Sequence, residues 1–174
     1  MRRLSTCFAI ALLAVITVDP IVSQAWSGAV NEKLSTPEQG LKSSKYPEVA
    51  RLLIPSLGIN EKVIPGTTMD VYNRGVGLWP TSPMAGQRGN LVVGGHRTSG
   101  RKPFRYIDKL RVGDSIVVQQ GGDEFVYKVT RQRIVKPTDV WVVKPTRTAT
   151  LTLFACHPVG SVKERIIVHA TLSS

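Results

Sequence analysis

The hydrophobic residues of this chain fall into short runs that are separated by glycine, proline and polar residues. The runs are rich in valine and isoleucine, which favour extended backbone, and none repeats with the period of a long amphipathic helix. Many short strands at such spacing are typical of a closed β-barrel or a β-sandwich. The chain is therefore predicted to be all-β, with strands at residues 50–54, 59–64, 90–95, 115–119, 124–134, 150–156 and 165–171.

The segments between these runs predict the connections. Gly121 and Gly122 separate two predicted strands and indicate a hairpin turn. Short helical turns are predicted at residues 70–74 and 104–110. Residues 136–147 hold two prolines and few core positions, so they predict a long loop before the strand that ends at position 156. Loops of this length on a barrel often border a binding groove.

The first 25 residues predict a signal peptide or a signal anchor. Arg2 and Arg3 precede an apolar run at residues 7–18. This run is shorter than the roughly 20 residues of a spanning helix and is typical of a signal-peptide core. Ser23 and Ala25 are small and suit cleavage before position 26. In either case the rest of the chain is predicted to lie outside the cytoplasm, because the arginines stay inside.

Residues 26–48 are polar and aperiodic, and they predict a linker or stalk. The domain is then predicted to span residues 49–174. Such a length is enough for a single packed core.

The net charge indicates which kinds of binding partner the protein favours. The chain has 23 Lys and Arg against 12 Asp and Glu, which gives a formal net charge of +11. This excess either favours anionic partners or only aids solubility. No nucleic-acid motif accompanies it, so a cell-wall polymer or a membrane surface is predicted and nucleic acid is not. In the long loop, Lys136, Lys144 and Arg147 are either contacts for such a partner or solvated charges.

Three side chains suited to acyl transfer lie in separate segments. Cys156 ends an apolar run, Arg165 follows nine positions later, and His96 lies 60 positions upstream of the cysteine. A thiol can act as a nucleophile, an imidazole can carry protons, and a guanidinium can stabilise an oxyanion. Since Cys7 falls in the N-terminal apolar run, Cys156 is predicted to be unpaired, as a reactive thiol or as a small buried hydrophobic residue.

These segments resemble the sortase family. Thr152-Leu153-Phe154-Ala155-Cys156 resembles the TLxTC signature of sortases, and Gly95-His96-Arg97-Thr98 resembles their glycine–histidine segment. Arg165 falls where sortases carry an arginine on the next strand, and residues 103–114 resemble the helix-turn-strand of the family. The pair His157-Pro158 is most similar to class E sortases of actinobacteria. The resemblance implies a closed barrel of about eight strands with short helices.

The resemblance also implies an activity, that of a cysteine transpeptidase. Cys156 would attack the scissile carbonyl of an LPxTG- or LAxTG-like sorting signal and form a thioester, and Arg165 would stabilise the oxyanion. His96 would protonate the departing amine. The acceptor would be an amine, on a peptidoglycan precursor or another molecule. The reaction implies no metal and no organic cofactor.

The resemblance places such an enzyme at the extracytoplasmic face of a bacterial cell membrane. The N-terminus would hold the chain there, or the protein would be secreted if the signal were cleaved.

Four further residues are predicted to contact the substrate. The apolar run that contains Trp141 and Val143 would receive the leucine of a sorting signal, although Trp141 could instead cap the barrel core. Ala155 and His157 flank the cysteine. Because neighbouring residues on a strand point to opposite faces, His157 is expected to be a groove or packing residue and not the base. His169, in the last predicted strand, is expected to be structural.

Ala155 departs from the family pattern, which has threonine at this position. The missing hydroxyl removes a hydrogen-bond donor, which would weaken transition-state stabilisation without abolishing it. Two alternatives therefore stay open. One is a catalytically weak surface-binding module that holds a sorting-signal peptide or a wall polymer. The other is a hydrolytic cysteine peptidase.

Overall fold

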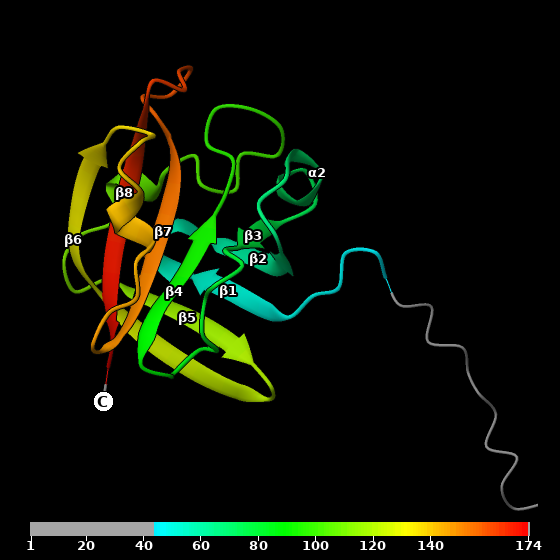
Figure 1. The fold of residues 1–174 in the computed structure, drawn as a ribbon, viewed down its shortest axis with the longest axis vertical. Coiled ribbons are helices and arrows are strands. Elements are labelled where there is room, and N and C mark those ends of the chain that lie inside the picture. Colours follow the sequence, from blue (N-terminus) through cyan, green and yellow to red (C-terminus); the bar gives the residue numbers. More distant parts are fainter. Residues whose placement is uncertain (1–43, 174) are drawn as a thin grey trace, which may run out of the picture. The chain divides into compact units, whose positions relative to one another are not determined.

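The protein, represented by a computed structural model, is described over residues 44–173. The predicted signal segment and most of the predicted linker lie outside the described residues. The described part forms a closed barrel of eight strands in the order β1-β2-β3-β4-β7-β8-β6-β5 (Figure 1). This confirms the predicted all-β barrel. The strands are β1 (Ala50–Ile54), β2 (Ile59–Pro65), β3 (Val76–Leu78), β4 (Gly89–Gly94), β5 (Ser115–Gln120), β6 (Asp123–Val135), β7 (Ala149–His157) and β8 (Glu164–Leu172).

Four short helices lie between the strands. They are η1 (Pro55–Leu57), α2 (Met69–Tyr72), η2 (Ile107–Lys109) and η3 (Val140–Val143). Thr68 caps α2 by accepting a hydrogen bond from the backbone N–H of Val71. The predicted helical turns at residues 70–74 and 104–110 therefore correspond to α2 and η2.

Seven of the eight strands coincide with predicted apolar runs, and β3 was not predicted. Only three residues form β3, and Gly77 is the central one, so no run is visible there. The predicted hairpin between β5 and β6 is present. Gly121 and Gly122 have φ of 66° and 93°, which is the left-handed backbone of a type I′ turn and favours glycine at both positions.

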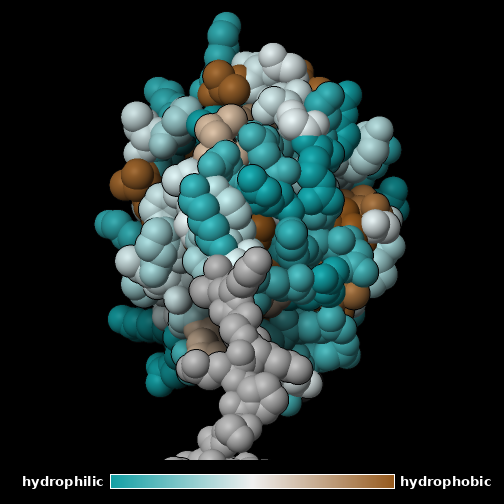
Figure 2. Space-filling model, turned by 90° about the vertical axis from the view of Figure 1, so that its right-hand side faces the viewer, coloured by the Kyte–Doolittle hydropathy of each residue, from teal (hydrophilic) through white to brown (hydrophobic). Residues whose placement is uncertain are grey.

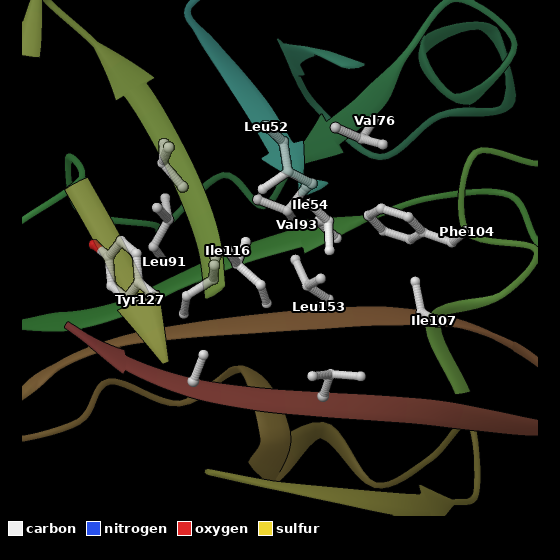
Figure 3. Close-up of a cluster of buried hydrophobic side chains, with 14 of the residues drawn as sticks. Leu52, Ile54, Val76, Leu91, Val93, Phe104, Ile107, Ile116, Tyr127 and Leu153 are labelled. Carbon is white, nitrogen blue, oxygen red and sulfur yellow. The ribbon is translucent and has the colours of Figure 1, made fainter. Parts of the chain in front are cut away.

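The barrel interior holds the hydrophobic core. Strand residues alternate between the interior and the outer face, and inward side chains from neighbouring strands meet there (Figure 3). Burial of each large aliphatic side chain stabilises the fold by about 1.5–3 kcal/mol. Fully or almost fully buried residues include Leu52, Ile54, Val93, Ile116 and Leu153.

The segment that connects β6 to β7, residues 136–148, is referred to as the η3 loop. It crosses the outside of the barrel and is held there by Asn90 of β4, whose Nδ2 donates to the carbonyls of Val142 (2.9 Å) and Lys144 (3.1 Å). The Oδ1 of Asn90 accepts a hydrogen bond from the hydroxyl of Thr152 (2.7 Å), and this hydroxyl also contacts Nδ1 of His169 (3.1 Å). A buried polar chain therefore anchors the loop to β4, β7 and β8.

His169 makes the stability of this region depend on pH. Burial, together with the charges of Arg131 and Arg133, lowers the pKa of His169 from 6.5 to about 4. The unfolded chain then binds more protons than the folded chain below pH 6.5, so stability is lost as the pH falls from 6.5 towards 4.

We expect His169 to account for about 2–3 kcal/mol of lost unfolding free energy over this interval. Denaturant unfolding of the wild type and of His169→Gln between pH 7.5 and pH 4 measures this loss of unfolding free energy. The difference between the two proteins should shrink in acid, and a pH-independent difference would contradict the assignment.

Hydrophilic side chains predominate on the face shown in Figure 2, where hydrophobic ones stand singly. Isolated apolar residues of this kind are ordinary on a protein surface. Within residues 44–173, no helix has the length and apolar character needed to cross a membrane.

Candidate active site

Strand register brings the three predicted catalytic residues to one end of the barrel. β4 and β7 are parallel neighbours with Gly94 opposite Phe154, so the chain reaches His96 and Cys156 at the same level, each two positions further on. β7 and β8 are antiparallel neighbours, and Cys156 lies directly opposite Arg165. In Figure 1 the segment after β4 and the β7–β8 connection both lie at the upper end of the barrel.

His96, Cys156 and Arg165 border one cavity of about 390 Å³, here called the Cys156 cavity. Cys156 is partly exposed and has no disulfide partner within the described residues. The thiol therefore points outward from β7 and is accessible, as a nucleophile must be. The cavity is also bordered by Thr67, Met69, Tyr72, Trp79, Gly95, Ser99, Phe154, Ala155 and Val162.

Two glycines, the last residue of β4 and the residue after it, allow the chain to approach its neighbours just before His96. A Cβ on Gly94 would lie 2.6 Å from the hydroxyl oxygen of Tyr72, and a Cβ on Gly95 would lie 2.7 Å from Cδ2 of Phe104. Both distances are too short for carbon, so only glycine fits without movement. The Gly-Gly-His sequence thus sets how closely the imidazole lies to the wall of the cavity.

Both ring nitrogens of His96 have a partner. Nε2 lies 3.2 Å from Oδ1 of Asn73, and Nδ1 lies 3.3 Å from the hydroxyl of Ser99. Because Oδ1 can only accept, Nε2 carries the proton of the neutral ring, and Nδ1 accepts from Ser99. His96 is 6% exposed, and burial lowers its pKa below the usual 6.5. A lower pKa makes the protonated ring a stronger acid towards a departing amine.

Replacing Asn73 by alanine is expected to lower the pKa of His96 further. Its amide oxygen stabilises the imidazolium more than the neutral ring, because hydrogen bonds from charged donors are stronger. We expect peptide turnover to fall about tenfold. General acid–base catalysis usually contributes a rate enhancement of about 10²–10⁴-fold, and a misplaced proton donor loses part of it.

An NMR titration of the histidine and a cleavage assay measure these two effects. Asn60→Ala is a matched control, because Oδ1 of Asn60 accepts a hydrogen bond from Arg51 and neither residue borders the Cys156 cavity. An unchanged histidine titration in Asn73→Ala would contradict the proposed contact.

Tyr72 is a cavity residue that no sequence pattern indicated. Its ring meets the His96 ring edge-on, with centroids 5.5 Å apart and planes at 60°. Burial, with the charge of Cys156 added, raises the pKa of Tyr72 to about 12, although the charge of Arg165 opposes the increase. Tyr72 therefore stays a neutral hydroxyl beside the reactive groups.

Arg165 is oriented by the backbone of the β7–β8 connection. Its Nη1 donates to the carbonyls of Val162 (2.8 Å) and Glu164 (2.9 Å). A guanidinium has five N–H donors, so most of them stay free for a substrate carbonyl. The positively charged guanidinium of Arg165 on β8 therefore lies opposite the thiol of Cys156 on β7.

Arg97 is a second feature that sequence reasoning missed. It is 2% exposed and pairs with Asp108 at 2.9 Å. Its Nη1 donates to Nδ1 of His157 (2.9 Å) and approaches the carbonyl of Cys156 (3.5 Å). Arg97 therefore ties the segment after His96 to the end of β7, which carries the cysteine.

The four predicted substrate-contact residues lie in different places. Val143 borders a second cavity, of about 190 Å³, which shares Trp79, Phe154 and Arg165 with the Cys156 cavity. Ala155 borders the Cys156 cavity, but its side chain is 2% exposed and belongs to the core.

The other two predicted contact residues lie elsewhere. Trp141 borders neither of these cavities and lies in a separate pocket, with Arg133 5.9 Å from its ring centroid. His157 is held by Arg97.

An outward thiol, a buried imidazole and a guanidinium around one cavity of a closed β-barrel are the groups that acyl transfer through a thioester requires. The chain belongs to the sortase family, because the Sortase domain model matches residues 52–173.

Two relatives show the extent of the similarity. Sortase SrtE1 of Streptomyces coelicolor is 32% identical over 141 residues, which cover 76% of this chain and 40% of that protein. Sortase D of Bacillus subtilis is 28% identical over 149 residues, which cover 81% of this chain and 74% of that protein. The match thus spans less than half of the Streptomyces relative. Class D and class E sortases are both among the relatives.

Solved structures agree with this assignment. Sortase E from Streptomyces avermitilis has a TM-score of 0.66 at 36% identity, with 73% of this chain and 88% of that chain covered. A Sortase D5 transpeptidase from Clostridium perfringens has a TM-score of 0.68 at 32% identity, with 73% and 79% covered. The barrel and its family are therefore established.

Proposed function

We propose that this chain is a sortase that cleaves an LPxTG- or LAxTG-like sorting signal and joins the surface protein to an amine of the cell wall. The observation that carries this proposal is that His96, Cys156 and Arg165 border the same cavity. An acyl transfer through a thioester needs a nucleophile, a proton carrier and an oxyanion donor within reach of one carbonyl. These three side chains supply one of each.

The first half-reaction forms the thioester. The thiolate of Cys156 attacks the scissile carbonyl carbon, and the C–S bond forms while the carbonyl oxygen becomes an oxyanion. Arg165, opposite Cys156 on β8, donates to this oxygen. The C–N bond then breaks, and protonated His96 gives its proton to the departing amine.

The second half-reaction transfers the acyl group. The acceptor amine attacks the thioester carbonyl, so the new C–N bond forms while the carbonyl oxygen becomes a second oxyanion, and the amine gives its proton to His96. The C–S bond then breaks. Arg165 stabilises the second oxyanion as it did the first. The thiolate and the protonated ring are restored, so the cycle consumes no cofactor.

The cavity that contains Val143 is suited to the apolar side chain of a sorting signal. It shares Trp79, Phe154 and Arg165 with the Cys156 cavity, and its other borders include Val142 and Ile167. An extended peptide could place its scissile bond at Cys156 and an upstream leucine against Val143. Trp141 faces another pocket, which leaves Val143 as the favoured contact of the two.

Ala155 does not weaken this proposal. Its side chain lies in the core, whereas Cys156 at the next position faces the cavity. A hydroxyl added at position 155 would therefore start from the interior side of β7. For this reason we favour an active enzyme over a module that only binds peptide.

We also propose that residues 1–25 direct the chain across a bacterial membrane and that residues 26–48 hold the domain away from it. The arginines before the apolar run of residues 7–18 support this orientation. The catalytic domain would then act on the extracytoplasmic side, where its wall substrates are found.

The test is incubation of the protein with quenched LPxTG and LAxTG peptides and a small amine. We expect a thioester adduct on Cys156 by mass spectrometry and an amine-dependent conjugate. Cleavage without conjugate at any amine concentration would favour a hydrolytic peptidase. Tight binding without an adduct would favour a binding module.

A further inference from the structure

A third pocket, of about 340 Å³, lies beside the η3 loop and is here called the His169 pocket. It shares Val142 with the cavity that contains Val143, and no residue with the Cys156 cavity. It is thus separate from the site of the proposed chemistry. Residues at its border include Arg131, Trp141, Lys144, Thr150, His169 and Thr171.

Hydrogen bonding fixes which nitrogen of His169 carries its proton. Asn90 donates to two loop carbonyls through Nδ2, so its Oδ1 faces Thr152 and accepts from that hydroxyl. The hydroxyl of Thr152 has then used its only proton, and it must accept from Nδ1–H of His169. The remaining nitrogen, Nε2, is therefore a bare acceptor.

This acceptor has no partner. His169 is 6% exposed, and its Nε2 is buried without a hydrogen bond to any described residue. An unsatisfied buried acceptor destabilises the fold, so a ligand that brings a hydroxyl to it would recover that stability. Arg131 and Arg133 disfavour a proton on the ring, which keeps Nε2 an acceptor.

The positive charge at the pocket favours a ligand that carries an anionic group beside its hydroxyl. Arg131 lies opposite His169 on β6, and Lys144 belongs to the η3 loop. None of the described residues at its border is acidic. A guanidinium and an ammonium are the side chains that proteins use most readily for phosphate.

We infer that the His169 pocket binds a phosphodiester flanked by hydroxyl groups, as in a glycerol-phosphate chain. The phosphate lies between Arg131 and Lys144, and a neighbouring hydroxyl donates to Nε2 of His169. The threonine hydroxyls of β7 and β8 contact the remaining polyol oxygens. This site would hold the domain against an anionic surface while the Cys156 cavity stays open.

The test uses the full chain and a glycerol-phosphate oligomer in isothermal titration calorimetry. Binding should weaken at least tenfold in the double variant Arg131→Gln/Lys144→Gln and fall with added salt. Lys128→Gln, an exposed cation on the same strand outside the pocket, should bind within twofold of the wild type. Equal losses in the double variant and the control would overturn the proposal.

Two further experiments test the hydroxyl contact and the phosphate contact of the ligand separately. Glycerol alone and sulfate alone should each bind at least tenfold more weakly than the oligomer, and sulfate binding as tight as the oligomer would refute the hydroxyl contact. The ¹⁵N resonance of His169 Nε2 should move only when the oligomer binds, and an unmoved resonance would refute that contact as well.

Binding of the oligomer identifies a wall-type polymer as the source of the phosphodiester. Binding only to phosphatidylglycerol vesicles, through the same two cations, identifies a lipid headgroup instead. No binding to either probe would overturn the proposal.

Discussion

Cys156→Ala is expected to abolish both the thioester adduct and the conjugate. Without the thiol no covalent intermediate can form, and loss of a nucleophile costs at least about 10³-fold in turnover. The fold should be unaffected, because Cys156 faces outward and is only partly buried. The measurement is peptide turnover with mass spectrometry, together with thermal unfolding of the same sample.

A control separates lost chemistry from lost binding. The alanine variant should still bind the sorting-signal peptide with an affinity close to that of the wild type, since the cavity walls are intact. Cys156→Ser keeps the shape and should be almost inactive, because a hydroxyl is far less ionised than a thiol at neutral pH. Persisting conjugate in the alanine variant would refute the proposed nucleophile.

Arg165→Gln is expected to lower kcat by about 10²–10³-fold, the usual cost of removing an oxyanion donor. The loss should appear mainly in kcat, because the donor acts on charge that develops in the transition state. Arg165→Lys should recover only part of the activity, since an ammonium keeps the charge but not the planar fork. Steady-state kinetics with the quenched peptide give these values.

Lys163→Gln is the matched control, because Lys163 lies two positions earlier, in the β7–β8 connection, and the substitution removes the same charge. Its side chain is exposed and does not border the Cys156 cavity. We expect its kcat to stay within twofold of the wild type. If both variants lost activity equally, the effect of Arg165 would come from general electrostatics and not from contact with the substrate.

Much of the barrel could be predicted from local patterns. Valine- and isoleucine-rich runs marked seven strands, because side-chain shape and alternation act over a few neighbouring residues. β3 has only three residues and includes Gly77, so its place depends on pairing with β2 and β4. Such pairing is a non-local property that no short window of sequence contains.

The meeting of His96, Cys156 and Arg165 could be expected from the family pattern but not from the residues alone. Their proximity depends on the parallel register of β4 with β7, whose members lie about 60 positions apart in the chain. Arg97 was overlooked for a related reason. Among 23 cationic residues nothing marks it, and its burial depends on Asp108 and on the end of β7.

The separation of Trp141 from Val143 follows from the helix type at residues 140–143. η3 is a 3₁₀-helix with three residues per turn, so residues two positions apart point about 120° away from each other. Val143 therefore faces the cavity next to Arg165, while Trp141 faces the His169 pocket. An apolar run by itself does not reveal this division.

The pairing of β7 with β4 on one side and β8 on the other has a consequence for how substrate specificity could change within the family. The three groups of the proposed chemistry lie on or just beyond three adjacent strands, whereas the cavity proposed for the apolar side chain of the peptide is bordered largely by the η3 loop. Under the proposed function, substitutions or length changes in that loop would alter which peptide is bound and would leave the positions of His96, Cys156 and Arg165 unchanged. An enzyme built in this way could change its substrate specificity through sequence changes in a single surface loop.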